Sequence, residues 1–223
     1  MRCRRHHYSK NYRKMEERFM TIDFDGLKNY TPKYIGLGEA RHAVVTIPFI
    51  KREDGGWDIL FEVRSETVMQ PGDVCLPGGR QEKGETWEET ALREAKEELF
   101  LEDGQLELLG PADVMMPGNV MIHTMMGILA GYKGGFDPEE VAETFTVPLE
   151  FFLEHEPDRY TVTRHVEMPP DFPFDKIYGG KKYGWKVFNE ETLFYYYGER
   201  TIWGLTAKIM YWFTKMIKEY IYD

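Results

Sequence analysis

Cysteine is nearly absent from this chain, with Cys3 and Cys75 alone among 223 residues. Two cysteines cannot build the disulfide framework that stabilises small secreted domains. We therefore expect a reducing, cytoplasmic setting, and we expect Cys75 to be a core residue rather than a nucleophile.

A run of residues able to span a membrane is also lacking. Residues 114–132 contain no Lys, Arg, Asp or Glu, but Pro117-Gly118-Asn119 interrupts them with turn-forming residues. Two β-segments explain this stretch better than a spanning helix. Lys208 and Lys215 likewise interrupt the apolar C-terminal run, so we expect no membrane partner.

Basic residues are few beyond the first eighteen positions. Residues 1–18 hold seven of the 28 Lys and Arg, which leaves 21 basic against 36 acidic residues, or −15, in residues 19–223. Such a surface repels polyanions, so the composition argues against a nucleic-acid partner.

The length suits one large domain, and no internal repeat or low-complexity linker divides it. We interpret residues 19–223 as a single domain. Residues 1–18 lack the apolar core of a signal peptide and are interpreted as an untargeted basic tail that need not be ordered. A weak organelle-targeting sequence, or an initiator at Met15 or Met20, is left open.

Strand-like and helix-like segments alternate along the domain, which favours a mixed sheet covered by helices. One helix has a clear start, because Thr86 and Glu89 form a capping-box pattern, and it should end near Phe100. We expect strands over residues 42–50, 57–63, 74–76, 106–109, 121–130 and 160–166. Besides the capped helix, we expect a helical turn at 137–140 and helices over 148–153 and 202–217, the last including Ile202-Trp203-Gly204.

Acidic residues gather in and before the capped helix, where residues 82–98 hold seven glutamates against three basic residues. A solvated acidic helix face is the simplest interpretation of such a run. However, Glu94, Glu97 and Glu98 are spaced i, i+3, i+4, so they share one side of the helix and repel one another. A divalent cation among them would relieve that repulsion, since Mg²⁺ and Mn²⁺ prefer carboxylate oxygen.

Two neighbouring features support a cation site. Pro77-Gly78-Gly79 places backbone carbonyls without side chains beside the cluster. Arg93 can pair with Glu85 or Glu97 and hold the preceding loop to the helix.

The whole segment resembles the signature of the Nudix hydrolase family, G-x5-E-x7-R-E-U-x-E-E-x-G-U, where U is a bulky apolar residue. The matching residues are Gly79, Glu85, Arg93, Glu94, Glu97, Glu98 and Leu101. Ala95 stands at a bulky position, and Phe100 replaces the late glycine. The resemblance implies an α/β/α sandwich around a mixed sheet, and hydrolysis of a nucleoside diphosphate linked to another moiety.

The resemblance also implies roles for the matching residues. Glu94, Glu97 and Glu98 would ligate Mg²⁺ or Mn²⁺ together with the Gly78 carbonyl, and with Arg93 they form the expected catalytic set. Gly79 and Glu85 would be structural. The general base would be a glutamate of the signature or a loop glutamate, for which Glu140 and Glu143 are candidates unless they only cap a helix.

Segments outside the signature resemble one subfamily, the coenzyme A pyrophosphatases. Residues 60–65 and 71–79 resemble its L-L-T-x-R-S and G-x-V-x-F-P-G-G segments, and residues 198–207 resemble its G-x-x-[IV]-W-G-x-T-A segment. Glu62 stands where threonine is usual and Leu76 where phenylalanine is usual. The spacer between the first two segments is one residue short and lacks the basic residues that are often found there.

The subfamily resemblance predicts hydrolysis of coenzyme A or a derivative to 4′-phosphopantetheine and adenosine 3′,5′-bisphosphate. Arg64 and Arg80 are the best-placed candidates for phosphate contacts, although ordinary surface charges would look the same. His42, Lys181 and Lys182 are weaker candidates.

Two other functions stay open at this point. One is a Nudix hydrolase of ADP-ribose or a nucleotide sugar, and the other is a non-catalytic nucleotide-binding module. In each case the partner is a small nucleotide, and a homodimer is left open.

Overall fold

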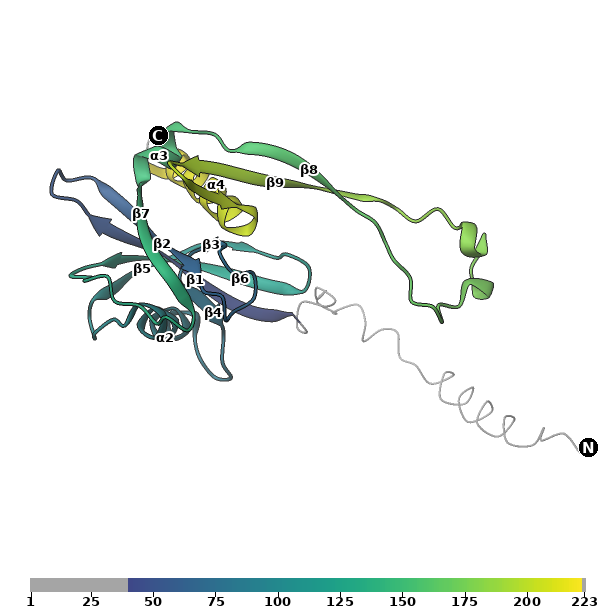
Figure 1. Cartoon of the computed structure of the whole chain (residues 1–223), viewed down its shortest axis with the longest axis horizontal. Coiled ribbons are helices and arrows are strands. Elements are labelled where there is room, and N and C mark those ends of the chain that lie inside the picture. Colours follow the sequence, from purple (N-terminus) through teal and green to yellow (C-terminus); the bar gives the residue numbers. More distant parts are fainter. Residues whose placement is uncertain (1–39, 222–223) are drawn as a thin grey trace, which may run out of the picture. The chain divides into compact units, whose positions relative to one another are not determined.

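A seven-stranded mixed sheet lies at the centre of the computed structural model, which describes residues 40–221 (Figure 1). The expected tail, residues 1–18, and both ends of the expected domain lie outside these residues. The strands are β1 (Arg41–Lys51), β2 (Trp57–Arg64), β3 (Val74–Cys75), β4 (Gly78–Arg80), β5 (Leu106–Met115), β6 (Val120–Leu129) and β7 (Val141–Pro148). Their order is β3-β2-β1-β6-β5, while β4 pairs with β1 and β7 pairs with β2. The β1–β6 pair is parallel and the others are antiparallel, so the sheet is mixed as predicted.

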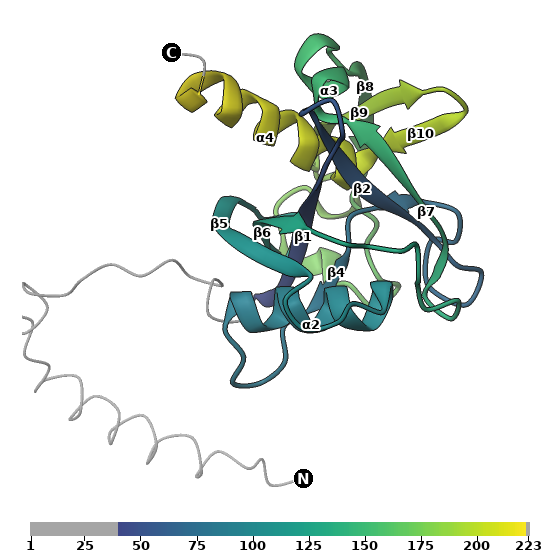
Figure 2. The same cartoon turned by 90° about the vertical axis from the view of Figure 1, so that its left-hand side faces the viewer.

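Helices cover both faces of this sheet, as Figure 2 shows. The helices are α2 (Trp87–Leu99), α3 (Leu149–Glu154) and α4 (Gly204–Ile221). Successive side chains of strand β2 point to opposite faces of the sheet. Leu60 packs with α2, whereas Ile59 and Phe61 pack in the cluster of α3 and α4. Each fully buried side chain of this size contributes about 1.5–3 kcal/mol to folding. The predicted α/β/α sandwich is therefore confirmed.

The capped helix begins where the sequence predicts. The Glu89 amide donates to Thr86 Oγ1 at 3.1 Å, and the Thr86 amide donates to Glu89 Oε2 at 2.7 Å. At the other end, Phe100 has a left-handed backbone with φ of 50°. Glycine adopts this conformation without cost, whereas another residue is strained by about 1–2 kcal/mol. The departure from the Nudix signature at this position is therefore confined to the helix exit.

The apolar stretch 114–132 forms the end of β5, a turn and strand β6, as expected. Within residues 40–221, no helix has the length and apolar character needed to cross a bilayer.

The expected helix over 202–217 is wrong at its start. Ile202 is fully buried but belongs to β10 (Arg200–Trp203), and α4 begins only at Gly204. Gly204 has a φ of +61°, which turns the chain from strand to helix, and a Cβ there would meet no atom within 4 Å. Ile202 matched the helical spacing by coincidence, because one buried strand position preceded the apolar face of α4.

The expected helical turn at 137–140 is a single hydrogen-bonded turn. The amides of Glu140 and Val141 both donate to the Asp137 carbonyl, and the chain then enters β7, which the sequence analysis missed.

A second sheet of three strands, in the order β10-β9-β8, was not predicted as a separate unit. It contains β8 (Asp158–Arg164) and β9 (Phe188–Tyr197), and the short helices η3 (Phe174–Lys176) and η4 (Gly180–Lys182) lie between them. Figure 1 shows β8 and β9 running out to these short helices, away from the main sheet. The strand expected over residues 160–166 is present as β8, shifted two residues toward the N-terminus, and all seven of its residues are exposed.

Gly78 allows the close approach of β4 to β1. Its φ is +147°, and a Cβ would clash with the Val44 carbonyl oxygen and lie 2.6 Å from Cα of Val45. Gly110 has a similar φ of +137°, but a Cβ there meets nothing within 4 Å. A residue with a side chain would therefore be strained at either position, but only at position 78 would its Cβ also clash with neighbouring backbone atoms.

We predict that Gly78→Ala is more destabilising than Gly110→Ala. Both variants lose about 1–3 kcal/mol to backbone strain. Gly78→Ala loses about 1–3 kcal/mol more, because a new methyl group is forced against fixed backbone. Urea unfolding followed by circular dichroism measures the difference, and equal losses would show that β4 has room to shift.

Candidate active site

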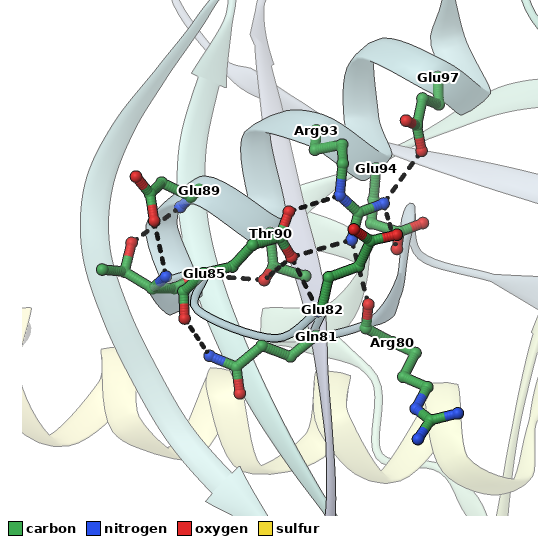
Figure 3. Close-up of polar contacts among 10 residues, drawn as sticks. Arg80, Gln81, Glu82, Glu85, Glu89, Thr90, Arg93, Glu94 and Glu97 are labelled. Carbon is green, nitrogen blue, oxygen red and sulfur yellow. Dashed lines mark hydrogen bonds and ion pairs between the residues drawn. The ribbon is translucent and has the colours of Figure 1, made fainter.

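One arginine organises the acidic segment between β4 and α2 (Figure 3). Arg93 donates to Glu85 through Nε at 2.7 Å and Nη2 at 3.1 Å. Its Nη1 donates to Glu94 at 2.8 Å and to Glu97 at 3.0 Å, and Nη2 also donates to the carbonyl of Arg80 at 3.1 Å. The expected pairing is therefore present with both partners, and it ties loop, strand and helix together.

Glu85 anchors the loop side of this network. The bonds from Arg93, together with those from the Glu82 amide and the Thr90 hydroxyl, lower the pKa of Glu85 to about 2. This carboxylate therefore stays charged at any physiological pH. Its bonds fix the loop over residues 81–86, in agreement with the structural role that the sequence predicts.

The three signature glutamates lie in different surroundings. The Glu94 carboxylate packs against Gly79, where a Cβ would be 2.5 Å from its Cδ atom. Glu98 is buried, and its Oε2 accepts the Gly78 amide at 2.7 Å. Glu97 stays at the surface, with its side chain 59% exposed.

The sequence predicts that these three carboxylates converge on one point. In the structure their side chains do not converge. Within residues 40–221, no three His, Cys, Asp or Glu side chains are close enough together to hold a metal ion. The physical reason is Arg93, which holds Glu97 and one oxygen of Glu94. A cation would have to compete with the guanidinium for Glu97.

Sequence reasoning missed one acidic residue, Glu62. It lies on β2 and is 1% exposed. Its Oε2 is 3.9 Å from the thiol of Cys75, and its Oε1 has no hydrogen-bond partner among the described residues. Burial and then the charge of Glu140 raise the pKa of Glu62, while burial and then the charge of Glu62 raise the pKa of Glu98. Its signals in the sequence were its place inside an otherwise apolar strand and its departure from the threonine usual at that position of the resembling segment.

The chemistry of this donor set fits a divalent cation. Two buried carboxylates that repel each other cannot both be charged without a compensating cation. Oxygen ligands of this kind are those that Mg²⁺ and Mn²⁺ prefer. Glu98 is buried inside the site, Glu94 is half-buried, and Glu97 stands at its exposed edge.

Of the two loop candidates for the general base, Glu140 is the one whose charge acts on the acidic cluster. Its charge raises the pKa of Glu62, Glu94 and Glu98. Glu143 instead forms an ion pair with Arg200. The guanidinium of Arg200 also lies 4.9 Å from the ring centre of Phe145, which indicates a structural pair.

The two predicted phosphate-binding arginines differ in position. Arg64 donates through Nε to the Met69 carbonyl at 2.7 Å and lines a cavity of about 250 Å³. Figure 3 shows the Arg80 side chain pointing away from the signature carboxylates. Neither arginine forms an ion pair within residues 40–221.

The weaker candidates have other surroundings. His42 Nδ1 is 3.0 Å from His123 Nε2, and Trp87 stacks on His123 with ring centres 3.8 Å apart. Lys181 and Lys182 belong to η4, at the far end of the β8–β9 hairpin in Figure 1.

Cys75 is half-buried beside Glu62, and burial raises the pKa of its thiol. Because a nucleophilic cysteine needs the thiolate, this environment supports the expectation that Cys75 is not a nucleophile.

Comparison with known proteins identifies the same family that the signature residues indicate. A model of the NUDIX domain matches residues 40–166. Mouse NUDT7, described as a peroxisomal coenzyme A diphosphatase, is 34% identical over 113 residues, which are 49% of this chain and 48% of the mouse protein. NudL of Photorhabdus laumondii, named a Nudix hydrolase, is 30% identical over 183 residues, or 80% of this chain and 86% of that protein.

A third relative is the mitochondrial Nudix hydrolase 15 of Arabidopsis thaliana, 29% identical over 76% of this chain and 56% of its own length. The chain thus spans about half the length of the mouse and Arabidopsis proteins. Among solved structures, a MutT/nudix family protein from Enterococcus faecalis is 16% identical, with a TM-score of 0.46 over 97% of this chain and 76% of that one. The domain match over more than half of the chain and the Photorhabdus relative together show that the chain belongs to the Nudix hydrolase family.

Proposed function

We propose that the chain is a metal-dependent pyrophosphohydrolase acting on coenzyme A or a derivative. One observation carries the choice of substrate: the segments before and after the signature helix that resemble coenzyme A pyrophosphatases line the same cavity. Arg64 comes from residues 60–65, Cys75 and Gly78 from residues 71–79, and Trp203 and Thr206 from residues 198–207.

Hydrogen bonds join residues 71–79 to residues 198–207, although these segments are far apart in the sequence. The Trp203 indole donates to Asp73 Oδ1 at 3.2 Å, and the Thr206 hydroxyl donates to the Val74 carbonyl at 2.9 Å. The cavity adjoins the acidic site, because Gly78 lines it and also donates to Glu98. A substrate in the cavity would therefore bring its pyrophosphate close to the signature glutamates. The coenzyme A diphosphatase named for the mouse relative is consistent with this assignment.

In the proposed reaction, water attacks one phosphorus of the pyrophosphate and the bond to the bridging oxygen breaks. Glu94, Glu97 and Glu98, with the Gly78 carbonyl, would hold a divalent cation, which when bound would offset the phosphoryl charge and lower the pKa of the attacking water. The chain's residues then have three tasks: Arg93 keeps the glutamates in position, Arg64 contacts a substrate phosphate, and Glu140 accepts the proton of the water. The products are 4′-phosphopantetheine and adenosine 3′,5′-bisphosphate.

A substrate panel tests this function. The full chain with Mg²⁺ or Mn²⁺ is expected to cleave coenzyme A with a higher kcat/KM than ADP-ribose or a nucleotide sugar, because the segments that resemble coenzyme A pyrophosphatases line the cavity beside the signature glutamates. Chromatography of the products measures each rate. Preferred cleavage of ADP-ribose would overturn the coenzyme A assignment, and no turnover of any compound would favour a nucleotide-binding module.

A pair of matched variants tests the general base. We predict that Glu140→Gln lowers kcat about 10²–10⁴-fold, the usual contribution of a positioned base. Glu143→Gln, which removes a carboxylate three residues away, should keep kcat within a few-fold of wild type. Steady-state kinetics on coenzyme A measures both, and the base assignment fails if Glu140→Gln turns over normally.

A further inference from the structure

Glu62 is a buried acid that the proposed reaction does not use. It lies on β2, and its neighbours in register are Cys75 on β3 and Thr144 on β7. Leu60, two residues earlier on the same face of the strand, packs against Ala95 and Leu99 of α2. The Glu62 side chain therefore points from the sheet toward the helix that carries the signature glutamates.

The Glu62 carboxylate lacks partners that would compensate its burial. Its Oε1 accepts no hydrogen bond among the described residues, and its Oε2 has only the weak thiol donor of Cys75 at 3.9 Å. A buried carboxylate in this condition is unfavourable unless it binds a proton or a cation compensates its charge. Either a shared proton or a bound cation must therefore account for the burial of Glu62.

The groups around Glu62 are mainly acidic. Its charge acts directly on Glu98, and the charges of Glu94 and Glu140 act on Glu62. Arg93 does not reach it, because that guanidinium is occupied by other partners. Arg64 is the one nearby base that favours the charged form, and its Nε donates to the Met69 carbonyl.

We propose that Glu62, together with the signature glutamates, would supply a further carboxylate ligand to the divalent cation of this site. The inference rests on the proposed function, which places that cation at the signature glutamates. It adds a ligand from the sheet, at a position where the resembling coenzyme A pyrophosphatases usually carry threonine. A threonine hydroxyl carries no negative charge, so this chain should hold the cation more tightly than a threonine variant does.

The test measures cation binding rather than turnover. Isothermal titration of the full chain with Mg²⁺ compares wild type with Glu62→Gln and Glu62→Thr, and melting temperature is recorded with and without Mg²⁺. We expect both variants to bind Mg²⁺ at least tenfold more weakly and to gain less thermal stability from it. Without Mg²⁺, Glu62→Gln should melt no lower than wild type, because it keeps the volume of the side chain and removes the repulsion between Glu62 and Glu98.

Glu143→Gln is the matched control, since it removes a carboxylate on the neighbouring strand β7 that is paired with Arg200. It should bind Mg²⁺ as wild type does. Unchanged affinity in Glu62→Gln would overturn the inference and indicate that Glu62 and Glu98 share a proton instead, while the proposed function stands. A wild-type chain that binds no Mg²⁺ would overturn both.

Discussion

The guanidinium of Arg93 is the contact on which the site depends. It joins the loop glutamate Glu85, the backbone of β4 and two glutamates of α2. A planar group with five fixed donors can hold partners on several sides at once, which the single ammonium group of a lysine cannot do. Through this contact β4 is held beside α2, so that Gly79 packs against Glu94 and the Gly78 amide reaches Glu98.

The same contact explains how so much negative charge can be tolerated. The −15 charge of residues 19–223 argues against anionic partners in general. The face of α2 is different, because its buried and half-buried carboxylates would attract cations, and bound cations would attract a polyanionic substrate. Arg93 compensates the outer members of the group, Glu94 and Glu97, but not the inner ones, Glu62 and Glu98. A divalent cation would therefore be most stabilising beside the inner pair, where no guanidinium compensates the carboxylates.

Features with local signals could be predicted from the sequence. The capping box and the signature depend on fixed spacing along one loop and one helix, so their geometry follows from the residues themselves. The surroundings of Glu62, Glu140 and Glu143 could not be predicted, because β3, β7 and Arg200 meet there only in the folded chain. Strand β9 was also missed: residues 189–192 are polar, and the aromatic residues that follow alternate in burial only where the strand pairs with β8 and β10.

The central claim is that the signature glutamates hold a divalent cation once Glu97 leaves Arg93. Electron paramagnetic resonance of the full chain titrated with Mn²⁺ tests it directly, with Glu97→Gln as the variant and Glu88→Gln, an exposed glutamate in the first turn of α2, as the control. We predict one class of bound Mn²⁺ in wild type and Glu88→Gln, and at least tenfold weaker binding in Glu97→Gln. Equal binding by all three proteins, or no bound Mn²⁺ in wild type, would contradict the account.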